Sequence, residues 1–297
     1  MFSPSTKIMI RKHGLRVDRF IHNYLYFVFY YPYVRAVKTV LPLLPRLPLR
    51  RPLAALGRMI FARYHSKVLS AGDTRKIFTL DHDMRVTGPG NRRVVPYKYA
   101  YDIIFQEPDY IAVMDCPCKL ATGAPTDTVN SCIAVGRGTA LFWLEHCGKY
   151  NARKISPEEA LSIITDLRAK GHLTQAFFKV ATGGSTGVIC NCLPDTCVSL
   201  MATRYCRELD GKLSMNAPAG YSVRRDEGRC RLCVACAGAC HFGGITVKDG
   251  VWSCDAGRCM GCELCVEACP EGALSLYRDP EKILPLDIES IERSAQP

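Results

Sequence analysis

Two runs of cysteine in the C-terminal quarter of the chain have the spacing of ligands to inorganic iron. They are Cys230-x2-Cys233-x2-Cys236-x3-Cys240 and Cys259-x2-Cys262-x2-Cys265-x3-Cys269-Pro270. Three thiolates separated by two residues can cap three corners of one cubane from a tight loop, whereas the fourth lies on a short helix that turns away. The fourth thiolate therefore reaches the other cluster. The spacing predicts two 4Fe-4S clusters, one held by Cys230, Cys233, Cys236 and Cys269, the other by Cys259, Cys262, Cys265 and Cys240.

The residues around these cysteines allow close approach of backbone to sulfide. Small or flexible residues serve this purpose, and the runs contain Ala235, Ala237, Gly238, Ala239, Gly261 and Ala268. On these motifs, residues 224–279 resemble the bacterial two-cluster ferredoxins. The resemblance covers roughly a fifth of the chain and departs from the family at one position, where His241 replaces the proline that Pro270 supplies in the second run. The alternative is a pair of zinc knuckles or a disulfide knot, but zinc needs only four ligands per site and no third two-residue step.

Cysteine usage also indicates the compartment. The 297 residues contain 17 cysteines, yet secreted disulfide scaffolds are short chains, and assembly of clusters requires reduced thiols. We therefore expect a reducing compartment, the cytoplasm. The apolar content of 48% is enough to give each of two domains a core.

Positive charge is concentrated at the N-terminus. Residues 1–70 contain thirteen Lys or Arg and the single acid Asp18, a net charge of +12, whereas the whole chain carries +11, so the other 227 residues sum to −1. The basic residues alternate with apolar ones and no nucleic-acid-binding motif accompanies them, so nucleic acid is not an expected partner.

An aromatic run lies within this basic segment. Residues 20–34 carry no charged side chain and are flanked by cations of residues 7–19 and by Arg35 and Lys38. As a helix, fifteen residues reach about 22 Å, short of a hydrocarbon layer of about 30 Å. Tyrosine prefers the headgroup region, and each cation adds about 1 kcal/mol beside anionic lipid. We expect residues 7–38 to contact an anionic membrane surface, peripherally at its inner face. The alternatives are aromatics packed against the protein or a partner subunit, and a cleaved signal peptide.

Prolines follow this run at a fixed interval. Pro42, Pro45 and Pro48 recur every three residues, the turn length of a polyproline II helix. The pattern predicts a semi-rigid spacer.

The middle region, residues 73–222, contains periodic elements. The pattern predicts a helix from Pro96 to before Pro108, a buried strand over 110–114 and a helix over 139–147. Ser156 as N-cap, Pro157 at the first helical position and Gly171 beyond the end predict another helix. A second short strand over 187–189 and a helix from about Cys197 to Leu209 follow.

Each of the two strands runs into a Cys-x-Cys pair. Cys116 and Cys118 follow the first strand, and Cys190 and Cys192 follow the second. Alternate residues of extended chain face the same side, so neighbouring strands would bring four thiols together at one end of a sheet. Cys132 and Cys197 would then lie in adjoining loops. These six candidates, Cys116, Cys118, Cys132, Cys190, Cys192 and Cys197, predict a metal centre, either a third iron-sulfur cluster or zinc; the alternative is buried cysteines without a ligand.

The regions together predict an α+β protein. We expect a basic, aromatic and proline-rich segment (1–72), a cysteine-rich α/β middle domain (73–222), a two-cluster ferredoxin domain (223–281) and a tail (282–297). Uncharacterised iron-sulfur proteins of anaerobes look similar, with a Cys-Pro-Cys half and a Cys-x-Cys half before a two-cluster module. The expected function is electron transfer with redox partner proteins. The alternatives are an oxidoreductase whose middle centre is catalytic and a redox or metal sensor. No acid or base beside the middle cysteines identifies a catalytic residue.

Overall fold

The computed structural model describes residues 3–13, 24–25, 27, 29–180 and 186–295. The N-terminal elements are α1 (Pro4–His13), α3 (Tyr30–Val40), the 3-10 helix η1 (Leu41–Arg46) and α4 (Arg50–Phe61). The middle elements are β1 (Tyr64–Val68), α5 (Ala71–Phe78), β2 (Met84–Val86), η2 (Pro89–Arg93), β3 (Ile103–Phe105), β4 (Ile111–Asp115), α6 (Pro117–Leu120), α7 (Thr126–Val129), β5 (Asn130–Val135), α8 (Arg137–His146), η3 (Gly148–Tyr150), β6 (Arg153–Ile155), α9 (Pro157–Ala169), β7 (Leu173–Lys179), β8 (Val188–Cys192), α10 (Val198–Leu209) and β9 (Asn216–Ala217). The last elements are β10 (Tyr221–Arg225), α11 (Ala235–Gly238), β11 (Ile245–Lys248), β12 (Val251–Cys254), α12 (Leu264–Glu267), β13 (Leu274–Arg278) and α13 (Ile288–Ala295).

A mixed sheet forms the centre of the protein. Within the described residues it has seven strands in the order β6-β4-β5-β8-β7-β1-β9, and all its pairs are antiparallel except β1 with β9. Helices and strands are both abundant, in agreement with the α+β class. Strand β1 pairs along its full length with β7. The sheet therefore extends N-terminal of the expected domain boundary at residue 72.

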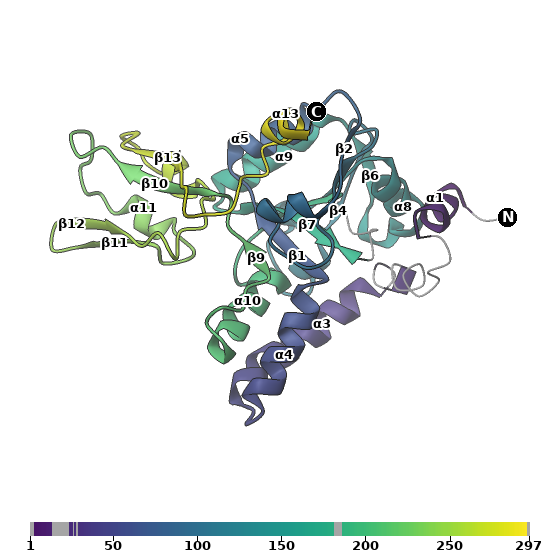
Figure 1. Ribbon diagram of the computed structural model, residues 1–297, viewed down its shortest axis with the longest axis horizontal. Coiled ribbons are helices and arrows are strands. Elements are labelled where there is room, and N and C mark those ends of the chain that lie inside the picture. Colours follow the sequence, from purple (N-terminus) through teal and green to yellow (C-terminus); the bar gives the residue numbers. More distant parts are fainter. Residues whose placement is uncertain (1–2, 14–23, 26, 28, 181–185, 296–297) are drawn as a thin grey trace.

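Both faces of the sheet are buried, and the cysteines point to one of them. On β5, Ile133 and Val135 belong to one core and Cys132 and Ala134 to the other. The first core lies under α5 and α9, with α13 against α5 (Figure 1), and the second under α8, α3 and the start of α10. The period of two along each strand therefore separates an aliphatic core from a core rich in sulfur.

Most of the predicted elements are confirmed. The strand over 110–114 is β4, and the predicted helices over 139–147 and from 157 are α8 and α9. The Ser156 hydroxyl accepts a hydrogen bond from the Glu159 amide at 3.2 Å, as an N-cap does. The helix from Pro96 is wrong, since Ala100 has a φ of 57° and β3 pairs with β2 instead. The proline spacer is also wrong over residues 41–46, which form η1, a right-handed helix of the same three-residue period.

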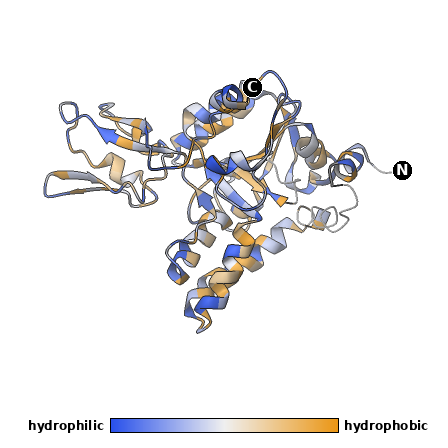
Figure 2. Ribbon diagram, viewed as in Figure 1, coloured by the Kyte–Doolittle hydropathy of each residue, from blue (hydrophilic) through white to orange (hydrophobic). Residues whose placement is uncertain are grey.

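The N-terminal elements form an arm that projects from the sheet. Helices α3 and α4 pack against α10, where Leu41, Phe61 and Cys206 belong to one apolar cluster. Figure 1 shows α3 and α4 of this arm projecting from the sheet, and Figure 2 shows hydrophobic residues along α4. No helix in the described part of the chain has the length and hydropathy that crossing a membrane would require.

The C-terminal module lies on the opposite side of the sheet from α1 (Figure 1). It consists of two antiparallel pairs, β10 with β13 and β11 with β12, and the short helices α11 and α12 follow its two cysteine loops. Residues after the module return to the middle domain, because Leu286 and Ile288 are buried in the core under α5 and α9 and Asp287 pairs with Lys76 at 2.8 Å. The expected tail thus packs as part of the middle domain.

Arg168 is the main polar link between the module and the middle domain. Its buried guanidinium pairs with Glu267 at 2.8 Å, donates to the Cys262 carbonyl at 2.8 Å and contacts the Thr174 hydroxyl at 3.3 Å. A second link comes from His241, whose Nε2 is 2.6 Å from the Gly171 carbonyl. The histidine that replaces the family's proline therefore has a docking contact of its own.

Replacing Arg168 should loosen the module. We expect Arg168→Met to reduce the free energy of unfolding by about 2–3 kcal/mol, because it removes charge-assisted bonds and leaves buried partners unsatisfied. The matched control Arg153→Met breaks a half-exposed pair with Glu159 and should cost less than about 0.5 kcal/mol. Urea unfolding measures the free-energy change in both variants, and hydrogen exchange measures the protection of the amides of residues 259–267. Equal protection of these amides in the two variants would contradict this role.

Candidate metal centres

The two cysteine loops of the module have the same backbone form. Residues with positive φ stand directly before and after the middle cysteine of each loop: Leu232 (56°) and Val234 (58°) in the first, Gly261 (67°) and Glu263 (73°) in the second. This conformation costs a non-glycine residue about 1–2 kcal/mol. At Gly261 a side chain is also sterically excluded, because a Cβ would lie 2.6 Å from the Tyr221 carbonyl oxygen. Strain at equivalent positions is typical of loops shaped around a ligand.

Each loop borders a small cavity lined by four cysteines. Cys230, Cys233, Cys236 and Cys269 line one cavity, with Trp252 and Leu274. Cys240, Cys259, Cys262 and Cys265 line the other, with Val223 and Ile245. In both cases three cysteines come from one run and the fourth comes from the other run. These are the two sets of four that the spacing predicts.

Backbone and side-chain donors surround these sulfurs. The Gly244 amide donates to Cys240 Sγ at 3.2 Å, and the Ala273 amide donates to Cys269 Sγ at 3.3 Å. Such N–H donors stabilise anionic sulfur and tune the reduction potential of a bound cluster. Cys254 on β12, which its spacing in the sequence does not single out, donates a hydrogen bond that lowers the pKa of Cys259 to about 5.

The six middle cysteines form one chain of thiols. Their hydrogen bonds run in the order Cys118, Cys116, Cys132, Cys190, Cys192, Cys197, and all six side chains are buried. Sγ of Cys132 lies 3.7 Å from Sγ of Cys190. Bonds from Cys118 and Cys132 lower the pKa of Cys116 well below its usual value, and bonds from Cys190 and Cys197 lower that of Cys192 in the same way. The structure therefore brings all six residues together.

The elements that carry these thiols differ from the predicted ones. Strands β4 and β8 are not neighbours, because β5 lies between them and places Cys132 directly opposite Cys190. The prediction that Cys132 lies in a loop is therefore wrong. Cys116 and Cys118 do not continue an extended strand, since Cys116 caps α6 and Pro117 is its first residue. Cys197 caps α10 in the same way.

Three lysines surround the thiol chain. Lys119 Nζ donates to the Thr128 carbonyl at 2.7 Å and lies 3.0 Å from Nδ1 of His172, whose pKa burial lowers to about 4. Lys38 of α3 donates to the carbonyl oxygens of Cys118 and Thr196. Burial lowers the pKa of both lysines and of Lys179, and the neighbouring thiols oppose this shift. Cations at such positions favour thiolates, the form that binds metals.

Other candidates lie outside the thiol chain. Cys147 is buried at the C-terminal end of α8, where burial raises its pKa to about 12, and His146 contacts Ser5 and Tyr24. Among the residues that the structure describes, no group of three or more His, Cys, Asp or Glu side chains is arranged around a position for a metal ion.

One comparison with known proteins identifies a motif in this chain. Residues 255–275 match the family described as 4Fe-4S binding domain, a stretch that contains the second cysteine run. No curated protein matches the sequence. The match covers a small part of the chain, and within that part it agrees with the strained loop and the cavity beside it. The chain is therefore an iron-sulfur protein that binds at least one 4Fe-4S cluster.

Proposed function

We propose that this protein transfers electrons through two 4Fe-4S clusters to a third metal centre, held by the six middle cysteines. The observation that carries the proposal is the pair of cavities, each lined by three cysteines of one run and the fourth cysteine of the other run. When bound, the clusters would accept and release single electrons. The chain's own part is to hold the thiolates, exclude water and fix the distance between the centres.

Contacts across the docking interface support a direct route between the second loop and the middle cysteines. Arg168 bonds to the Cys262 carbonyl and to Thr174, whose hydroxyl donates to Asn191 Oδ1 at 3.0 Å. Asn191 lies between Cys190 and Cys192. We therefore assign the second loop as the side that faces the middle centre. The first loop, whose Cys233 is exposed, is the side that would meet a redox partner protein.

The competing function is an oxidoreductase in which the middle centre is catalytic. The observation that favours it is an apolar cavity directly beside the thiol chain. A redox or metal sensor has no need of such a cavity.

Crossed ligation can be tested with serine substitutions. We expect Cys240→Ser to reproduce the EPR spectrum of Cys262→Ser, and Cys269→Ser to reproduce that of Cys233→Ser, because each pair serves one cluster. Cys254→Ser, a cysteine of the same module that lines neither cavity, should retain both clusters. A Cys240→Ser spectrum equal to that of Cys233→Ser would show that ligation is not crossed.

The middle centre can be tested in the full-length protein. Cys132→Ser should remove the metal that exceeds the eight irons expected in the module, because Cys132 joins the two Cys-x-Cys pairs. Cys147→Ser is the matched control, since this thiol is equally buried but outside the chain, and it should retain the metal. Iron, zinc and sulfide analysis of anaerobically purified protein gives the result; unchanged metal content in Cys132→Ser refutes the centre.

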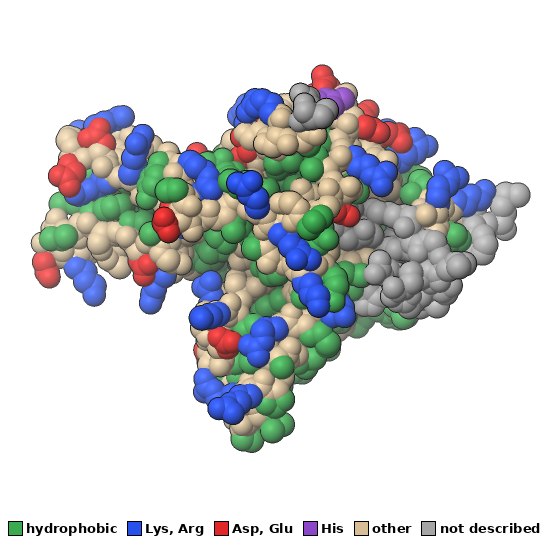
Figure 3. All heavy atoms as spheres, viewed as in Figure 1, with side chains coloured by type: hydrophobic (Ala, Val, Ile, Leu, Met, Phe, Trp, Pro, Cys, Tyr) green, Lys and Arg blue, Asp and Glu red, His purple; other side chains and the backbone are tan. Residues whose placement is uncertain are grey.

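A membrane surface is the second partner that we propose. Of the segment expected to contact it, residues 7–38, positions 14–23, 26 and 28 lie outside the described residues. Of the described residues in that segment, Phe27, Tyr30 and Val34 are buried against the middle domain, as the packed alternative predicts for them. Leu25, Phe29 and Tyr33 of the same segment are exposed, and exposed apolar side chains continue through η1 and the turn after it onto α4, at Leu43, Leu47, Leu49 and Met59. Residues 30–63 carry seven Lys or Arg and no acid, and the two kinds of side chain lie side by side at the tip of the arm (Figure 3). This combination suits an anionic bilayer at the reducing, cytoplasmic face.

Charge reversal at the tip tests this contact. We expect Arg46→Glu with Arg51→Glu to weaken flotation with anionic liposomes at least ~10-fold, since each cation contributes about 1 kcal/mol, and the remaining binding should fall as salt rises. The control reverses two exposed cations elsewhere, Arg75 and Lys248, for the same change in net charge. Deleting residues 1–38 is a poor test, because Lys38 bonds to the carbonyl oxygens of Cys118 and Thr196 beside the middle thiols. Equal flotation of the two double variants would contradict the contact.

A further inference from the structure

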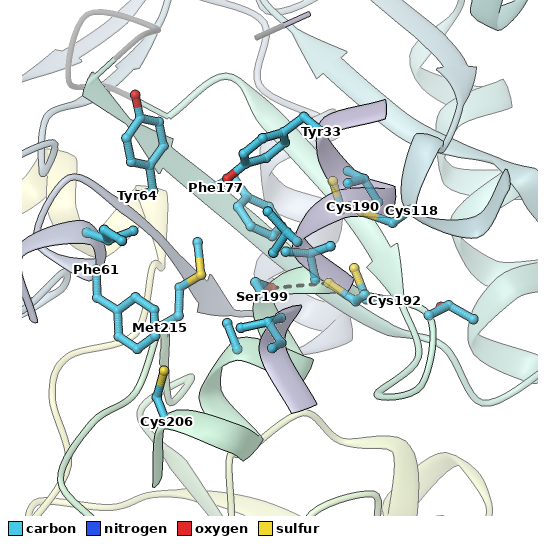
Figure 4. A pocket seen from close by; sticks show the side chains of 18 of the residues that line it. Tyr33, Phe61, Tyr64, Cys118, Phe177, Cys190, Cys192, Ser199, Cys206 and Met215 are labelled. Carbon is cyan, nitrogen blue, oxygen red and sulfur yellow. Dashed lines mark hydrogen bonds between the residues drawn. The ribbon is translucent and has the colours of Figure 1, made fainter. Parts of the chain in front are cut away.

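A cavity of about 210 Å³ extends from the six thiols toward α4. Figure 4 places Cys118, Cys190 and Cys192 at one side and Phe61, Met215 and Cys206 at the other. The far part is walled mainly by apolar side chains of η1 and α4, which are Leu41, Leu44, Leu53 and Leu56. For comparison, a dry cavity of about 150 Å³ lined by apolar side chains binds benzene. The space beyond the thiols is therefore suited to an apolar molecule.

The cavity reaches the surface between α3 and α4. Among its lining residues, Tyr33 and Leu56 are each 47% exposed and Ile60 is 41% exposed. These three residues belong to the same arm whose outer face is apolar and cationic. A molecule that enters here would come from the surface that we propose lies on the bilayer.

The two ends of the cavity differ in chemistry. Near the thiols, the lining includes the polar side chains of Ser199 and Lys119, and the rings of Tyr33 and Phe177 stand at the same side of the cavity. Aromatic walls favour a flat ring, and a few polar groups in an apolar pocket fix its orientation. Toward α4 the lining is aliphatic, which suits a hydrocarbon tail.

We propose that this cavity binds a lipid-soluble quinone, with its ring toward the thiols and its tail toward the opening between α3 and α4. The inference that a quinone binds depends only on the size and the lining of the cavity. The role of the quinone as a redox partner of the middle centre and its entry from a bilayer both rest on the proposed function.

Binding can be measured on the anaerobically purified full-length protein. The probe is decylubiquinone, titrated calorimetrically in detergent, and decanoic acid is the probe for a tail without a ring. We expect Leu56→Trp and Ile60→Trp, which place a large ring at the opening on half-exposed positions, to weaken decylubiquinone binding by about tenfold or more, equivalent to ~1.4 kcal/mol. Met59→Trp is the matched control, because Met59 is 51% exposed on the same helix and does not line the cavity, and it should bind like the wild type.

The outcomes separate this site from the proposed function. Decylubiquinone binding by wild-type protein that holds no metal at the middle cysteines would support the cavity and refute the centre. Wild-type protein with full metal content that fails to bind would overturn the cavity site. Equal affinity in Leu56→Trp, Ile60→Trp and Met59→Trp would overturn it as well, and so would decanoic acid binding as tightly as decylubiquinone.

Discussion

Cys116 and Cys192, two of the six buried middle thiols, have pKa values well below the usual one, and a buried thiolate at either position needs positive charge nearby. An unpaired buried thiolate is costly, and Lys38, Lys119 and Lys179 each come from a different element around the chain of sulfurs. Lys38 belongs to α3, so the N-terminal arm covers the sulfur-rich core and also supplies one of the three cations around it. This explains why Phe27 and Val34 of the same segment are fully buried. The arm, the sheet and the cysteines form one structural unit.

The docking of the module depends on the same unit. Arg168 leaves α9 near the end of the helix and reaches both the backbone of the second cysteine loop and Thr174 of β7. His172 and Gly171 connect the adjacent turn to Lys119 on one side and to His241 on the other. Two polar routes thus run from the ferredoxin-type loops to the middle thiols.

Local motifs could be predicted from the sequence, whereas the order of strands could not. The cysteine runs are short, so sterics alone fix how three thiolates and a departing fourth are arranged, and the Ser156 and Pro157 signals likewise act within one turn. The place of β5 between β4 and β8 depends on pairings across about sixty residues, which is why Cys132 was expected in a loop. The helix expected from Pro96 failed because pairing of β3 with β2 outweighs local periodicity. No local sequence pattern predicts the docking role of Arg168 or the contact of Lys38 with the middle cysteines, because both arise only when distant segments meet.

Anomalous diffraction from crystals of anaerobically purified protein tests the central claim most directly. Data collected above and below the iron and zinc absorption edges locate each metal without reference to activity. We expect iron at two positions in the module, between Cys230, Cys233, Cys236 and Cys269 and between Cys240, Cys259, Cys262 and Cys265. We also expect iron or zinc beside Cys132 and Cys190. Iron confined to the C-terminal module, with neither iron nor zinc at the middle cysteines, would contradict the central claim.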